Sequence, residues 1–171
     1  VFLMISYCIP YFNNSSVLPR CLTSIKRVHE VSDVLFEVVI IDDCSEDLES
    51  KALIGLIQNY SEELPIRMFR LKRNRGVTFA KNQAYIRSFG DWCVFIDSDD
   101  YFEESEALLM LKDLPRLSSY SIVFFHCITH MQGTVIESRE LARDISFRLY
   151  LNEGTGSEAL TVINKRIVNV K

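Results

Sequence analysis

Three aspartates stand within four residues at positions 97–100, directly after the apolar run 92–96. Carboxylates held this close raise one another's pKa unless a cation lies between them. In an extended chain Asp97 and Asp99 point to the same side, where both can bind one divalent ion together with phosphate oxygens and water. The alternative is a solvent-exposed acidic turn that caps a helix expected from residue 103.

A second acidic pair, Asp42 and Asp43, follows the apolar run 36–41. Either carboxylate is suited to accept hydrogen bonds from a nucleobase or a ribose. The alternative is that Asp43 or Ser45 caps the helix that follows, whose first turn is acidic.

A third cluster, at 74–82, joins a strand to a helix and contains Asn74, Arg75, Gly76 and Lys81. A glycine here allows close approach of a ligand to the backbone. The first amides of the helix then form an anion site with Arg75 or Lys81. An ordinary turn with two solvated cations is the alternative. The cluster contains neither G-x-G-x-x-G nor G-K-[ST], which argues against a dinucleotide site of the common type and against a P-loop.

Alternating strands and helices position these clusters. Strands are expected at 2–9, 36–41, 66–71 and 92–96, and helices at 16–29, 47–60, 77–89 and 103–113. Continuous apolar strands joined by helical crossovers predict an α/β fold, in which helices flank a mostly parallel sheet. Ligands of such sheets bind beyond the carboxyl ends of the strands, where all three clusters stand. Asn14 and its neighbours are expected to cap the first helix.

The last third of the chain has a different pattern. Residues 121–131 and 134–138 predict a β-hairpin around Gln132-Gly133, and a helix is expected at 143–151. Residues 159–168 fit neither a strand nor a helix clearly.

Composition narrows the class of protein further. A chain of 171 residues, 48% hydrophobic and 25% charged, is expected to form one globular domain. The net charge of -4 leaves no basic surplus, which argues against nucleic-acid binding. Five cysteines without a C-x-x-C pair indicate core residues in a reducing compartment rather than a zinc site. We therefore expect a cytoplasmic location, with the inner face of the membrane as a further place.

One local basic run, from Arg67 to Arg75, could attract a diphosphate or anionic membrane headgroups. A solvated face is the alternative for this run. The sequence thus allows peripheral membrane association, and it leaves the oligomeric state open.

Four motifs in order resemble glycosyltransferase family 2, which has the GT-A fold. They are IPYFN at 9–13, IIDDCSED at 40–47, NRGVTFAKN at 74–82, and a Gly-Asp followed by IDSDD at 96–100. The resemblance covers about residues 2–113. Lys81 stands where this family often has arginine, which keeps the charge but loses the bidentate fork.

The resemblance implies a nucleotide pocket whose residues can be carried over one by one. Asp42 would bind the base, expected to be uracil, with Asp43 nearby, and Lys81 would lie near the diphosphate. The remaining pocket residues would be Pro10, Tyr11, Asn13, Asn74, Arg75 and Gly76.

The resemblance also implies a metal centre and a catalytic carboxylate. Asp97 would lie near the ribose and the metal, Asp99 would be the main protein ligand of Mn²⁺ or Mg²⁺, and Asp100 would support it. The general base is expected after the hairpin, where Glu158 is the best candidate. A helix-start acid behind Ser157 is the competing interpretation of Glu158, and the base could also lie beyond residue 171.

The expected function is transfer of a sugar, with inversion, from a nucleotide-sugar donor to a hydroxyl of a glycan or lipid-linked acceptor. The UDP-sugars are the expected donors. In one GT-A domain over 1–171, residues 1–113 would bind the donor, and 114–171 would be a partial, truncated acceptor-side half. The alternatives are a catalytically silent nucleotide-sugar-binding domain and a receiver-like signalling module.

Overall fold

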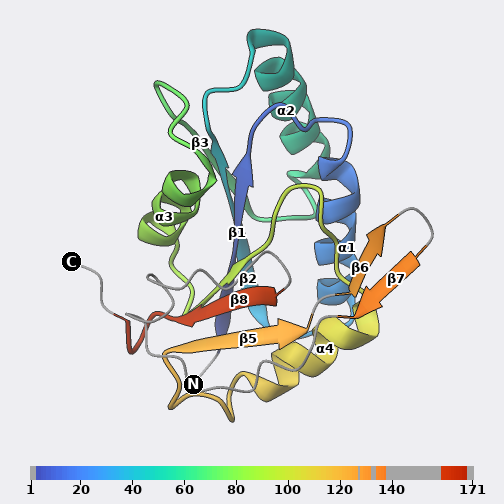
Figure 1. Ribbon diagram of the computed structural model, residues 1–171, viewed down its shortest axis with the longest axis vertical. Coiled ribbons are helices and arrows are strands. Elements are labelled where there is room, and N and C mark those ends of the chain that lie inside the picture. Colours follow the sequence, from blue (N-terminus) through green and yellow to red (C-terminus); the bar gives the residue numbers. More distant parts are fainter. Residues whose placement is uncertain (1–2, 127, 132–133, 138–158, 169–171) are drawn as a thin grey trace.

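A computed structural model describes residues 3–126, 128–131, 134–137 and 159–168 of the chain. Its first two-thirds alternate strand and helix as predicted (Figure 1). The strands of this part are β1 Met4–Tyr11, β2 Leu35–Asp42, β3 Ile66–Arg70 and β4 Trp92–Phe95. The helices are α1 Leu18–Glu30, α2 Asp47–Tyr60, α3 Val77–Arg87 and α4 Glu104–Asp113.

The main sheet has six strands in the order β3-β2-β1-β4-β8-β5. Strands β1 to β4 run parallel, whereas β8 (Ala159–Asn164) lies antiparallel between β4 and β5 (Ile122–His126). The chain adds strands on one side of β1 and then crosses to the other side at β4. The junction of β1 and β4 is therefore the topological switch point, where sheets of this class bind ligands. The predicted α/β fold is confirmed.

Two apolar layers fix the helices to the sheet. Side chains of α1, α2 and α4 pack with alternate residues of β1, such as Tyr7 and Ile9, on one face of the sheet. On the other face, Ala80 and Ala84 of α3 pack against Cys8 and Val39. Strands buried on both faces explain why the sequence shows continuous apolar runs. Among the described residues, no helix combines the length and the apolar character needed to cross a bilayer.

The hairpin prediction was partly wrong. The predicted strand 121–131 is two elements, because β5 joins the main sheet beside β8 and only Ile128–Met131 (β6) pairs with Thr134–Glu137 (β7). The ambiguous segment 159–168 supplies β8. The predicted helix at 143–151 lies outside the described residues.

The expected cap of the first helix was also wrong. Val17 precedes α1 without a side-chain cap, and the Asn14 side-chain amide instead donates a hydrogen bond to Ser98 Oγ, at 2.9 Å. This bond joins the loop after β1 to the aspartate cluster after β4.

Candidate nucleotide and metal site

A cleft of about 320 Å³ opens at the carboxyl ends of β1, β2 and β4. It lies at the switch point of the sheet, so the fold alone marks it as the candidate ligand site. Four segments contribute its lining: Pro10, Tyr11, Phe12 and Asn14; Asp43; Asn74, Gly76, Val77 and Ala80; and Asp97, Ser98 and Asp99. The three clusters singled out in the sequence therefore share one cleft.

The aspartate cluster forms a tight turn held from α1. The Asp100 amide donates to the Asp97 carbonyl at 3.0 Å, and Arg20 Nη2 donates to the Asp99 carbonyl at 2.9 Å. The Arg20 guanidinium also lies 4.3 Å from the ring centroid of Tyr101. Arg20 thus fixes the backbone that carries Asp99, which no sequence motif indicated.

The carboxylates of this turn repel one another. Burial, together with the charges of Asp97 and Asp99, raises the pKa of Asp100, while Lys81 and Arg20 oppose that rise. Lys81 Nζ lies 2.8 Å from Asp97 Oδ1, so a lysine ammonium already pairs with one oxygen of this carboxylate. Three carboxylates with one paired lysine leave the turn with an excess of negative charge, which a further cation would reduce.

Mn²⁺ or Mg²⁺ fits these residues in part. Asp97 and Asp99 both line the cleft and supply the hard carboxylate oxygens that such ions prefer. The described residues gather no set of three or more protein ligands, so phosphate oxygens and water would complete the coordination.

The two acids after β2 have different environments. Asp42 is fully buried and lies outside the cleft lining, where its carboxylate accepts hydrogen bonds from Ser45 N at 2.8 Å and Ser50 Oγ at 3.2 Å. Arg70 Nε approaches the same carboxylate at 3.4 Å. Asp42 therefore stabilises the loop 42–45 rather than facing the cleft.

Asp43 does line the cleft, and its carboxylate holds the loop that precedes α3. It accepts hydrogen bonds from the amides of Arg75, at 2.8 Å, and Gly76, at 2.7 Å. Gly76 has φ +85°, a left-handed conformation that glycine adopts without a steric penalty. The helix α2 has no side-chain cap, so the capping role considered for Asp43 or Ser45 is wrong. One of the amides expected to bind an anion is thus already used by Asp43.

Two residues of the first motif act mainly through neighbouring loops. Asn13, at φ 52°, accepts a hydrogen bond from Glu46 N through its side-chain Oδ1, at 2.9 Å. Its backbone N–H donates a hydrogen bond to Ser45 Oγ, at 3.0 Å. Tyr11 donates its hydroxyl to Glu49 Oε2 at 3.1 Å, and burial raises the pKa of Tyr11 to about 12. Both contacts tie the end of β1 to the loop and helix after β2.

Comparison with known proteins identifies the family of this chain. The sequence model of Glycosyl transferase family 2 matches residues 6–165, which is most of the chain. The chain belongs to this family. One relative, an uncharacterized glycosyltransferase of Haemophilus influenzae, is 33% identical over 121 residues, which cover 71% of this chain and 38% of the relative. A dolichyl-phosphate beta-glucosyltransferase of Dictyostelium discoideum is 36% identical over 103 residues, covering 56% of this chain and 30% of the relative.

The fold is similar to that of a solved glycosyltransferase. The crystal structure of Staphylococcus aureus TarS in complex with UDP-GlcNAc superposes with a TM-score of 0.58 and 25% identity. The match covers 70% of this chain and 33% of that one. The chain thus spans about a third of the length of these relatives. Family membership leaves the receiver-like alternative without support.

The sequence missed some cleft residues and selected others that lie elsewhere. Phe12, Asn14, Val77, Ala80 and Ser98 line the cleft without having been predicted. Asn14 and Ser98 adjoin predicted residues and are polar, so proximity in the sequence was a usable signal. The apolar residues Phe12, Val77 and Ala80 reach the cleft because of the path of the backbone. Their residue types give no sign of that position.

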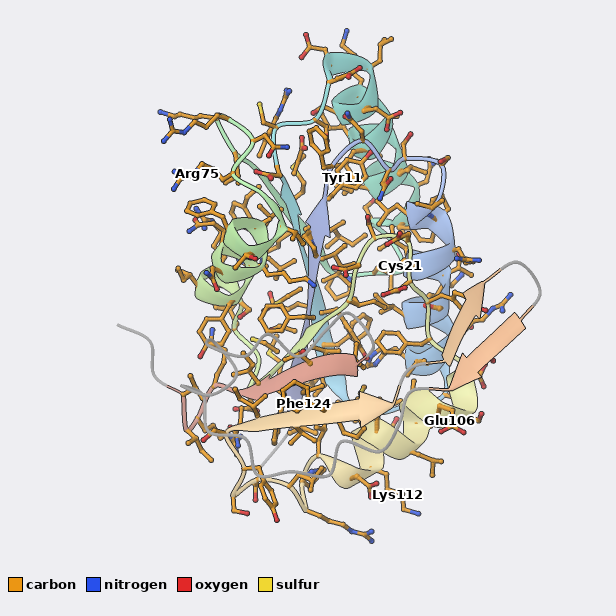
Figure 2. All side chains as sticks on the ribbon, in the orientation of Figure 1. Tyr11, Cys21, Arg75, Glu106, Lys112 and Phe124 are labelled. Atoms are coloured by element: carbon orange, nitrogen blue, oxygen red, sulfur yellow. The ribbon has the colours of Figure 1, made fainter. Side chains whose placement is uncertain are left out.

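Five predicted residues lie outside the cleft lining: Asn13, Asp42, Arg75, Lys81 and Asp100. The Arg75 guanidinium stacks on the Phe79 ring with its centre 4.1 Å from the centroid, and Figure 2 shows Arg75 extending from the loop before α3. Glu158, the candidate base, lies outside the described residues.

Proposed function

We propose that the chain binds a UDP-sugar in the cleft and, in the whole protein, transfers the sugar to a hydroxyl of a glycan or lipid-linked acceptor. The observation that carries this proposal is the meeting of Asp43, Asp97 and Asp99 at one cleft of the switch point. The similarity to TarS, whose structure holds UDP-GlcNAc, supports the donor class. The similarity to a dolichyl-phosphate glucosyltransferase supports a lipid-linked acceptor.

In this proposal the nucleotide lies against the segments after β1 and β2. Asp43 and the Asn74–Gly76 loop face the base, and Pro10 and Tyr11 form the opposite wall. The base-binding role expected for Asp42 becomes a positioning role, because Asp42 is buried behind the cleft. Asn13 and Arg75 hold the two loops in place.

Asp97 and Asp99 are proposed to hold Mn²⁺ or Mg²⁺ beside the donor diphosphate. Such an ion neutralises the negative charge that grows on the diphosphate as it leaves the sugar. Lys81, at 2.8 Å from Asp97, adds a positive charge at the same place. Asp100 supports the turn through its amide, which donates to the Asp97 carbonyl.

The acceptor hydroxyl is proposed to lose its proton to a carboxylate, for which Glu158 is our candidate. Attack from the face opposite the leaving group would invert the anomeric centre in a single displacement. We assign donor binding to residues 1–113 and the acceptor side to 114–171. Synthesis of a polysaccharide or a glycolipid in the cytoplasm, at the inner face of the membrane, would fit this chemistry.

Calorimetric titration of the chain with UDP-, GDP- and dTDP-sugars, with and without Mn²⁺, tests the proposal. We expect a UDP-sugar to bind more tightly with Mn²⁺, and Asp99→Ala to lose that metal dependence while keeping the wild-type circular dichroism. Glu106→Ala is the matched control, because it removes an exposed carboxylate of α4 away from the cleft (Figure 2).

Two results would contradict the proposal in different ways. If no nucleotide sugar binds, the donor site is wrong. If Asp99→Ala keeps full metal dependence, the metal site is wrong. Binding without turnover in the full-length protein, when acceptors are supplied, would support the silent binding domain instead.

A further inference from the structure

The side of α3 away from the sheet carries apolar side chains that are exposed or half-buried in the described part of the chain. Ala80 and Ala84 face the sheet, and Ile86 lies on the other side of the helix, 62% exposed. Phe89, just past the end of α3, is 73% exposed. Phe79, which is half-buried, lies about two helical turns before Ile86 on the same side of α3. Exposed apolar residues that lie in a row, rather than singly, indicate a contact surface.

Arginines cover two of these rings. The Arg75 guanidinium lies 4.1 Å from the centroid of Phe79, and the Arg67 guanidinium lies 4.1 Å from that of Phe89. A guanidinium stacked in this way keeps its charge at the surface above an apolar ring. We call this surface, made by Phe79, Ile86, Phe89 and the cations of the same segment, the α3 face.

The α3 face is strongly cationic within an acidic chain. From residue 66 to residue 89 the sequence has seven basic residues and no acidic one. The other 12 basic residues are outnumbered by all 23 acidic ones, so the remainder of the chain has a net charge of -11. The segment 66–89 is therefore positive and the rest of the molecule is negative. This separation of charge would turn the segment toward a negatively charged surface.

Most of these cations are available to a partner. Three of the seven form ion pairs with carboxylates of the sheet, of the cleft or of α2. Among the described residues, four have no acidic partner: Lys72, Arg73, Arg75 and Arg87. Lys72 and Arg73 are exposed on the loop that leads into the cleft residue Asn74.

We propose that the α3 face binds the surface of a bilayer that contains anionic phospholipids. Lys72 and Arg73 precede α3, and Arg87 lies in its last turn next to Ile86. These cations and the exposed Ile86 and Phe89 side chains match both parts of such a surface, the charged headgroups and the apolar region beneath them. Single-stranded nucleic acid also attracts cations and aromatic rings, but the net charge of -4 argues against it, and its binding is an outcome of the test below. This inference locates the membrane association suggested under the proposed function, and its test needs no nucleotide sugar.

Sedimentation of the chain with phosphatidylcholine vesicles that contain roughly 30% phosphatidylglycerol tests the inference, with pure phosphatidylcholine vesicles for comparison. We expect binding only to the anionic vesicles, with affinity that falls as salt is added. Each cation at such a surface contributes about a fivefold factor, so the double variant Lys72→Glu/Arg73→Glu should bind at least about 30-fold more weakly. Phe89→Ser should weaken binding about tenfold.

Matched controls separate the α3 face from charge and hydrophobicity in general. Lys51→Glu/Lys112→Glu makes the same change of charge on α2 and α4, and Figure 2 shows Lys112 at the opposite end of the molecule from Arg75. Leu48→Ser removes a side chain that is 81% exposed on α2. Phe89→Ser, Leu48→Ser and Lys51→Glu/Lys112→Glu should keep the wild-type affinity for a UDP-sugar, because they alter no cleft residue and no residue next to one.

Three outcomes would overturn the inference. The first is absence of binding to the anionic vesicles. The second is an equal loss of vesicle binding in Lys51→Glu/Lys112→Glu, which would mean that the net charge of the chain, and not the α3 face, sets the affinity. The third is self-association, or binding of single-stranded RNA, that Phe89→Ser abolishes while vesicle binding stays at wild-type level. Failure to bind a UDP-sugar would instead count against the proposed function.

Discussion

The carboxylate of Asp43 should control donor affinity through the loop 74–76. It is 3% exposed and accepts two backbone hydrogen bonds, from Arg75 and Gly76, at 2.8 and 2.7 Å. Asn at this position keeps one carbonyl acceptor but turns an NH₂ group toward the other amide. Asp43→Asn therefore loses one charge-assisted hydrogen bond and leaves an N–H without a partner, which costs about 2 kcal/mol.

If the loop closes one wall of the nucleotide site, that free energy is lost from binding. We expect the affinity of Asp43→Asn for UDP, measured by titration calorimetry, to be about 30-fold lower than that of the wild type. Asp47→Asn is the control, because the Asp47 carboxylate is 89% exposed and lies 3.5 Å from Arg70, outside the cleft. An exposed pair of this kind contributes about 1 kcal/mol at most, and we expect no change in UDP affinity.

The reasoning would be refuted if Asp43→Asn bound UDP with wild-type affinity and unfolded at the wild-type denaturant concentration. The two amides would then have found other acceptors. A loss of stability with unchanged affinity would place the loop outside the nucleotide site.

Three further predictions concern positions around the site. Arg20→Ala removes the hydrogen bond to the Asp99 carbonyl, at 2.9 Å, and should weaken Mn²⁺ binding about tenfold in an electron paramagnetic resonance titration, with little change in fold. Gly90→Ala would place its Cβ 2.5 Å from Ser6 Oγ and 2.7 Å from Ser6 N, and should lower the free energy of unfolding by about 2 kcal/mol in denaturant titrations. Burial lowers the pKa of His29 to about 4, from an ordinary value of 6.5. The unfolded chain then takes up a proton before the folded chain does, so stability should fall by about 2 kcal/mol as the pH drops from 6.5 to 4, and His29→Gln should abolish that dependence.

Local sequence patterns were sufficient for the parallel half of the fold. The strand expected at 2–9 forms as Met4–Tyr11 and continues through Pro10, and the helix expected at 77–89 forms as Val77–Arg87. Tertiary pairing decided the rest. Strand β8 pairs with β4, about 70 residues earlier in the chain, and no local pattern encodes a partner at that distance. Strand β8 also pairs with β5, so β5 belongs to the main sheet and not to the hairpin predicted from residues 121–138.

The sequence by itself determined the class of fold and the chemistry available at the carboxyl ends of β1, β2 and β4, because residue types and periodicity are local properties. It did not determine which of Asp42 and Asp43 faces the cleft. Successive side chains of a strand point to opposite sides of the sheet. The register of β2 against β1, which sets Asp42 opposite Tyr11, therefore decides which of the two aspartates faces the cleft. Only the assembled sheet buries Asp42 with Ser45, Ser50 and Arg70, and turns Asp43 toward the cleft.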